Sequence, residues 1–126
     1  MEIQAIQKYI HTAPRKLRLV ADMIRKLSPE KALETLRFTN KSAAGDLIKA
    51  IKTVVANAKT KGMENINFKS VEVNEGSRMK RFRAGAKGRA RPYKRRMSHI
   101  KIVLTDDLSD KVQVTRNKKE DKKEKK

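Results

Sequence analysis

The chain has 126 residues, of which 37% are hydrophobic and 37% are charged, and its formal net charge is +19. This length suits one domain with a modest core, and the absence of cysteine excludes disulfides and thiolate metal sites. The first residues lack the basic and apolar stretches of a secretory signal, and no apolar run approaches the roughly 18 residues of a membrane span. We therefore expect a soluble protein of the cell interior with no membrane partner.

The first part of the chain predicts a strand and then a helix. Residues 2–10 alternate loosely between apolar and polar side chains, which favours a strand. Pro14 suits the first turn of a helix whose cap would be Thr12 or Ala13. Apolar residues at helical spacing then give this helix one buried stripe: Leu17, Val20, Ala21, Ile24 and Leu27.

Two further helices are predicted before residue 62. Ser28 is a suitable cap, Pro29 a suitable first residue, and Glu30 an acid in the first turn, so a short helix begins there and ends near 38–40. Its expected buried residues are Ala32, Leu33 and Leu36. The third helix begins around Ser42 and ends before Gly62. One of its faces carries Leu47, Ile48, Ile51, Val54, Val55 and Ala58.

After Gly62 the apolar residues alternate, as they do in strands. Val71 and Val73 alternate with polar residues, and so do the apolar residues of 100–104. Two strands on either side of a basic segment with glycines predict a long antiparallel hairpin over about 76–100, with its tip near Gly85–Gly88. At about 3.3 Å per residue, its arms reach roughly 30 Å beyond the sheet.

The hairpin arms contain few apolar residues, and a two-stranded ribbon alone is marginal in water. We therefore expect a tip that is mobile in the free protein and ordered by a partner. Val112 and Val114 are candidates for a last short strand, which would close a single domain over residues 1–114. Residues 115–126 have the composition of a disordered charged tail.

The segment 78–96 is the most informative part of the sequence. It contains ten basic residues and no acid: Arg78, Lys80, Arg81, Arg83, Lys87, Arg89, Arg91, Lys94, Arg95 and Arg96. Such a density of like charge repels itself and attracts polyanions. Arginine predominates, and its planar guanidinium binds phosphate bidentately and stacks on bases. The segment therefore predicts a nucleic-acid-binding element, with features that favour structured RNA.

A second basic cluster, Arg15, Lys16 and Arg18, lies near the start of the first predicted helix, whose free N–H groups also attract phosphate. We interpret it as a phosphate-contacting patch, with a solvated helix face as the alternative. For the tail, a flexible arm with weak and non-specific contacts is the favoured interpretation.

Phe82 and Tyr93 are the aromatic residues of the basic segment, and two interpretations of them remain open. They stack on exposed RNA bases, or they pair with each other across the hairpin. Gly85 and Gly88 also have two explanations: close approach of the backbone to RNA, or the positive φ that a turn requires.

No catalytic or metal-binding pattern is found. His11 and His99 are far apart in the sequence, and the acidic residues Asp106, Asp107 and Asp110 lack the glycine and glutamate of a calcium loop. We expect no enzyme activity, no cofactor and no metal.

Three stretches resemble the large-subunit ribosomal protein twenty-two family. The first contains Lys80, then Ala86-Lys87-Gly88-Arg89, then HIKIVL at 99–104. The second is APRKLRLVADMIR at 13–25, which is similar to the family's first helix, and the third is ANA at 56–58, similar to the end of its third helix. The resemblance covers roughly 3–106. It departs at Gly85, where Arg or His is usual, and at Ala13, where a Ser cap is usual.

The resemblance implies an α+β fold in which three helices pack on a small antiparallel sheet with one long basic β-hairpin. It implies a structural constituent of the large ribosomal subunit, in the cytoplasm, that binds rRNA and connects several rRNA domains during assembly. The hairpin tip would line the nascent-peptide exit tunnel. The implied partners are large-subunit rRNA, neighbouring large-subunit ribosomal proteins and the nascent polypeptide, and no homo-oligomer is expected.

Taken together, the basic clusters and the resemblance give two sets of expected site residues. The rRNA-binding residues are Arg15, Lys16, Arg18, Arg78, Lys80, Arg81, Arg83, Lys87, Arg89, Arg91, Lys94, Arg95, Arg96 and His99. The tunnel-lining residues are Arg83, Ala84, Gly85, Ala86, Lys87, Gly88, Arg89, Ala90 and Arg91.

The main alternative function is an architectural DNA-bending protein with basic β-ribbon arms. Such arms insert apolar wedges, often proline, into the minor groove. The one proline of the basic segment, Pro92, lies on a predicted strand beside the turn and not at the Gly85–Gly88 tip.

Overall fold

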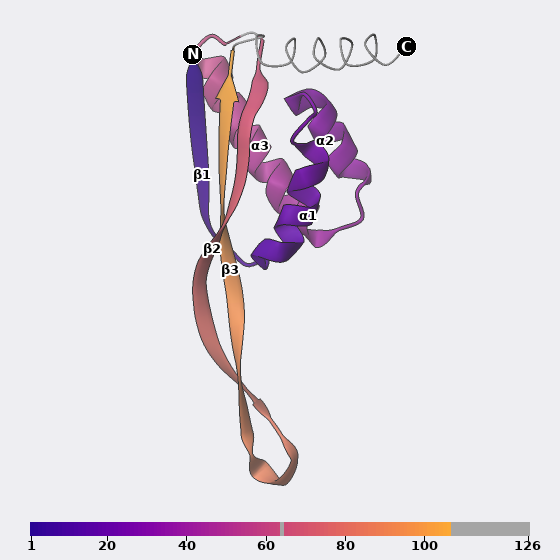
Figure 1. The fold of residues 1–126 in the computed structure, drawn as a ribbon, viewed down its shortest axis with the longest axis vertical. Coiled ribbons are helices and arrows are strands. Elements are labelled where there is room, and N and C mark those ends of the chain that lie inside the picture. The colour runs from indigo at the N-terminus through magenta and orange to yellow at the C-terminus, as the bar shows by residue number, and fades with distance from the viewer. Residues whose placement is uncertain (64, 107–126) are drawn as a thin grey trace, which may run out of the picture.

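The computed structural model describes residues 1–63 and 65–106. Its elements in chain order are β1 (Glu2–Ile10), α1 (Pro14–Ile24), α2 (Pro29–Phe38), α3 (Ser42–Thr60), β2 (Asn67–Ala84), the short 3-10 turn η1 (Ala86–Gly88) and β3 (Ala90–Thr105). The helices lie together on one side of the sheet, and β2 and β3 continue far past them as a two-stranded ribbon (Figure 1). The predicted α+β class is confirmed.

The sheet is antiparallel with strand order β1-β3-β2, so β3 is central. In this register Ile102 of β3 lies opposite Ala5 of β1 and Val71 of β2. Ile100, Ile102 and Leu104 are fully buried. Their alternation with more exposed neighbours is the period of a strand with one face on a core.

Helix α3 supplies the largest share of the helical core. Leu47, Ile51 and Val54 are fully buried, and α3 packs against α1, α2 and the sheet. Most of the predicted stripe residues belong to the core cluster. Four of them, Leu27, Leu33, Ile48 and Val55, are only partly buried at its edge, and Leu27 lies beyond the end of α1.

Helices α1 and α2 begin at predicted cap residues, but neither cap side chain forms a hydrogen bond with its helix. Ala13 and Ser28 do occupy the N-cap positions of α1 and α2, but Ser28 makes no side-chain cap hydrogen bond. At the other end of α3, the N–H of Met63 donates to the oxygen of Ala58 (3.1 Å) and the N–H of Gly62 to the oxygen of Lys59 (3.0 Å). With φ +73° at Gly62, this is the Schellman arrangement that ends helices.

Two glycine substitutions in and after α3 are expected to have opposite effects. Gly62→Ala places a side chain at positive φ and should lower the free energy of unfolding by about 1–2 kcal/mol. Gly45 lies inside α3, and nothing is near the methyl group that Gly45→Ala would add. This substitution should raise the free energy of unfolding by about 0.5–1 kcal/mol. Urea denaturation measures both. A stabilising Gly62→Ala would contradict the assignment of the helix end.

The hairpin leaves the sheet at a place that we call the neck, residues 76–77 of β2 with 97–99 of β3. The register shifts there between Glu75 and Arg78, and β1 shifts at the same level between Gln7 and Ile10. Both shifts are β-bulges, which bend strands and increase their twist. The buried Ser98 hydroxyl donates to the carbonyl oxygen of Thr12, which attaches the neck to the segment before α1.

Beyond the neck, the strands form the ribbon, which we define as residues 78–96. No residue of the core cluster lies in it. The predicted strand at Val112 and Val114 and the predicted tail at 115–126 lie outside the described residues. Among the residues that are described, no helix is long and apolar enough to cross a membrane.

Candidate nucleic-acid interface

The register of β2 and β3 sorts the ribbon side chains onto two faces. Residues that lie opposite each other in an antiparallel pair share a face, and successive residues alternate. One face, which we call the arginine face, carries Met79, Arg81, Arg83, Arg91, Tyr93 and Arg95. The other, the mixed face, carries Arg78, Lys80, Phe82, Ala84, Ala90, Pro92, Lys94 and Arg96.

Three pairs of cations lie directly opposite each other across the ribbon: Arg78 and Arg96, Lys80 and Lys94, and Arg83 and Arg91. Like charges in this position destabilise a sheet. The ribbon itself contains no acid, and of these six cations only Arg78 forms an ion pair among the described residues, with Glu75 just before the ribbon. An external polyanion such as a phosphate backbone would remove the repulsion, because each phosphate can lie between two cations.

The two ribbon aromatics do not pair with each other, so that interpretation is wrong. Tyr93 lies opposite Arg81, whereas Phe82 lies opposite Pro92, which places the two rings on different faces. The Cζ atom of Arg83 lies 4.8 Å from the centre of the Tyr93 ring, a cation–π geometry. The Tyr93 ring therefore has a partner inside the protein on the arginine face.

The tip of the ribbon is a tight turn. The N–H of Arg89 donates to the oxygen of Ala86, and Lys87 and Gly88 between them have φ +56° and +69°, as in a type I′ turn. Gly88 thus supplies one of the two positive φ values of the turn, and Lys87 supplies the other. Gly85 has φ −114°, and its glycine is explained instead by space, because a Cβ there would lie 2.9 Å from the Arg89 carbonyl oxygen.

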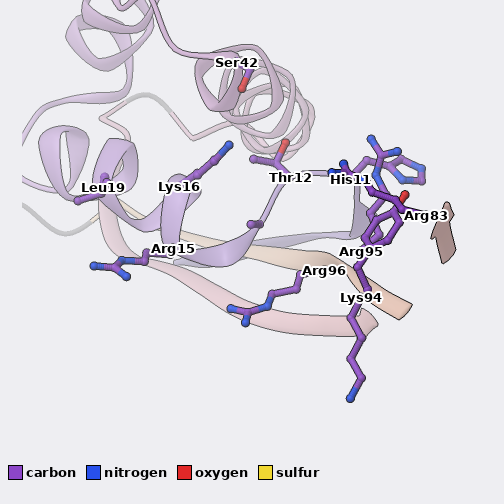
Figure 2. A pocket seen from close by; sticks show the side chains of 12 residues that line it. His11, Thr12, Arg15, Lys16, Leu19, Ser42, Arg83, Lys94, Arg95 and Arg96 are labelled. Carbon is purple, nitrogen blue, oxygen red and sulfur yellow. The ribbon is translucent and has the colours of Figure 1, made fainter. Parts of the chain in front are cut away.

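The start of α1 and the ribbon form a groove lined by cations from both. Arg15 and Lys16 come from α1, and Arg83, Lys94, Arg95 and Arg96 from the ribbon. Figure 2 shows Lys16 and Thr12 on the helical side and the ribbon residues across from them. We call this groove, between the start of α1 and the ribbon, the corner groove. The N-terminal N–H groups of α1 add positive potential to it. The two basic clusters predicted from sequence therefore meet at one surface.

The matching family model is that of "Ribosomal protein L22p/L17e", and it covers residues 5–105. The chain belongs to the L22p/L17e family. Its similarity to curated relatives extends over most of both chains. It is 43% identical over 111 residues to "Large ribosomal subunit protein uL22" of Solibacter usitatus. The aligned region covers 84% of this chain and 97% of that protein.

Two other relatives with the same name show similar agreement. The protein of Mycoplasma capricolum is 44% identical over 110 residues, covering 85% of this chain and 99% of that protein. That of Leptospira biflexa is 38% identical over 110 residues, covering 84% and 95%. L22p/L17e proteins are components of the large ribosomal subunit, a structural family and not a family of enzymes.

In this L22p/L17e chain, two of the expected site residues outside the ribbon, Arg18 and His99, also have contacts within the protein. The Nε atom of Arg18 donates to the carbonyl oxygen of Val73 (3.1 Å), which attaches α1 to β2. His99 accepts a hydrogen bond at Nδ1 from the N–H of Tyr9 (3.0 Å), and the two rings meet edge to face at 5.1 Å. Arg18 keeps free donors on its exposed guanidinium, whereas His99 is held at the neck.

Sequence reasoning missed Glu75, which lies three residues before the basic segment. Its carboxylate accepts a hydrogen bond from the Arg78 guanidinium at 2.7 Å. This hydrogen bond and the positive charge of Arg78 lower the pKa of Glu75 below its ordinary value, and Arg18 and Arg96 contribute further. The spacing of an acid three residues before an arginine was a visible signal, but pairing at that spacing in a strand depends on the bulge between them.

Glu75→Gln is expected to strengthen RNA binding. The change frees Arg78 for phosphate and removes a negative charge, so the slope of log K against log salt should become steeper by about one. Filter binding to rRNA at several salt concentrations measures both effects. Glu34→Gln on exposed α2 makes the same charge change away from the ribbon, and should alter neither. Equal effects of the two variants would show that only net charge matters.

Proposed function

We propose that the chain binds rRNA in the large subunit of cytoplasmic ribosomes, connects several rRNA segments during assembly, and lines the nascent-peptide exit tunnel with its hairpin tip. The observation that carries this proposal is the set of three like-charged pairs across a ribbon that lacks acids. Phosphates beside such a ribbon would relieve the repulsion between its paired cations. Family membership supports rRNA as the source of those phosphates.

The proposed contacts are divided between the ribbon and the corner groove. The ribbon cations and the α1 cations Arg15, Lys16 and Arg18 bind rRNA backbone, and His99 contributes from the neck. The tip, residues 83–91, faces the nascent polypeptide. Neighbouring large-subunit proteins are further partners. Because α1 and the ribbon approach the corner groove from different directions, one chain can hold two RNA segments together.

The mechanism of binding is neutralisation of converging phosphates with release of their counterions. If six to ten phosphates are neutralised, log K should fall against log salt with a slope of about −4 to −9. The first experiment is sedimentation of a tagged copy from lysate on sucrose gradients at low and high salt. Co-migration with the large subunit at both salt concentrations is the expected result.

Competition with duplex DNA separates rRNA binding from DNA bending. Excess duplex DNA should leave the rRNA complex in place. Displacement of the chain from rRNA, or migration with chromosomal DNA on the gradient, would overturn the proposal in favour of an architectural DNA-binding protein.

A further inference from the structure

The mixed face of the ribbon presents an aromatic ring that has no partner ring among the described residues. Phe82 is 71% exposed, and the residue directly opposite it is Pro92. The next pair toward the tip on this face is Ala84 with Ala90, whose side chains are small. The ring of Phe82, the ring of Pro92 and the two alanines therefore form an open apolar floor.

Cations border this floor on the side of the neck. Lys80 and Lys94 form the adjacent pair on the same face, and Arg78 and Arg96 form the next. Adjacent pairs on one face of a strand are about 6.6 Å apart. A flat apolar surface therefore lies beside two ammonium groups, an arrangement that matches a nucleotide, which joins a flat base to a phosphate.

Tyr93 does not offer the same site. The residue is 36% exposed, half as much as Phe82, and the Arg83 guanidinium lies over its ring. A base on the arginine face would have to displace Arg83 from the ring. On the mixed face, nothing has to be displaced.

We propose that Phe82 and Pro92 form a platform on which one unpaired RNA base stacks, while Lys80 and Lys94 bind the phosphate backbone beside it. This inference rests on the proposed binding of rRNA and specifies the kind of RNA at this position. The platform selects a single-stranded or bulged nucleotide over a continuous duplex, because only an unstacked base exposes its face. It tolerates any base, since every base has such a face.

The absence of tryptophan makes a fluorescence test of the platform possible. Phe82→Trp introduces one reporter on the platform. Phe38→Trp introduces one at the end of α2, where Phe38 is 90% exposed. Helix α2 lies beside the sheet and away from the ribbon (Figure 1). Single-stranded oligoadenylate should quench Trp fluorescence in the first variant and not in the second. Duplex RNA of equal length should bind both variants without quenching either.

Binding affinity gives a second and independent measurement. Phe82→Ala should weaken binding of oligoadenylate by about ten- to hundredfold, the usual effect of losing one stacked base. Its salt slope should stay unchanged, because no charge is removed. Phe38→Ala is the matched control and should change neither quantity. Phe82 lies outside the core, so the variant retains its fold.

The outcomes separate this inference from the proposed function. Salt-dependent binding that is unaffected by Phe82→Ala, with no quenching of the Trp in Phe82→Trp, would overturn the platform and leave rRNA binding intact. Failure of the unmodified chain to bind rRNA would overturn both. Equal quenching by duplex and single-stranded RNA would also overturn the platform, because a duplex offers no unstacked base.

Discussion

Replacement of residues 78–96 by the dipeptide Asn-Gly is expected to weaken rRNA binding by roughly three orders of magnitude while leaving the rest of the chain folded. The replacement removes ten cations and the proposed platform at Phe82. It removes no member of the core cluster, and the dipeptide forms the two-residue turn that hairpins prefer. Filter binding near 0.1 M salt measures the affinity, and urea denaturation measures the free energy of unfolding.

The control for this replacement is deletion of residues 115–126. That segment contains seven basic and three acidic residues, so its deletion also lowers the net charge of the chain. It lies outside the residues that match the family. Its removal should change affinity far less. If deletion of 115–126 weakened binding as much as loss of the ribbon, non-specific charge and not the ribbon would account for the affinity.

Ile51→Ala is expected to be strongly destabilising. Ile51 is fully buried in α3, the helix that packs against α1, α2 and the sheet. Removal of its outer carbons leaves a cavity and should lower the free energy of unfolding by about 2–5 kcal/mol, a large part of the roughly 5–15 kcal/mol of a typical domain.

Ile51→Val is a milder variant at the same position. It removes one methylene group and should lower the free energy of unfolding by about 0.5–1.5 kcal/mol. Urea denaturation of both variants tests the order of the effects. An equal cost for the two would contradict the close packing of α3. RNA binding by folded Ile51→Ala should be unchanged, because Ile51 contributes nothing to the ribbon or to the corner groove.

Much of the fold was predictable because its signals are local. The helical spacing of apolar residues in 14–60 and the alternation at 71–73 and 100–104 each depend on neighbours in sequence. The charge of the ribbon was equally visible. Gly88 followed from turn chemistry, since type I′ turns need positive φ at both central positions.

The features that sequence reasoning missed depend on which residues face each other across strands. The separation of Phe82 from Tyr93 onto two faces requires the register, which no local pattern gives. The bulges at the neck depend on distant contacts, including the Tyr9 to His99 hydrogen bond across 90 positions of sequence. The need for glycine at position 76 was also hidden from the sequence, because it comes from a distant residue: a Cβ at Gly76 would lie 3.2 Å from the His99 ring.

The continuity of β3 through the neck has a geometric consequence. The same strand is central in the sheet and forms one arm of the ribbon, so the buried side chains at 100, 102 and 104 set the direction in which every ribbon side chain points. One extra residue pair at the neck would exchange the arginine face and the mixed face without altering composition in the ribbon. A second extra pair would restore the faces and move the tip outward by about 7 Å. The orientation of the two ribbon faces is therefore fixed by whether the number of residue pairs between the core and the tip is odd or even.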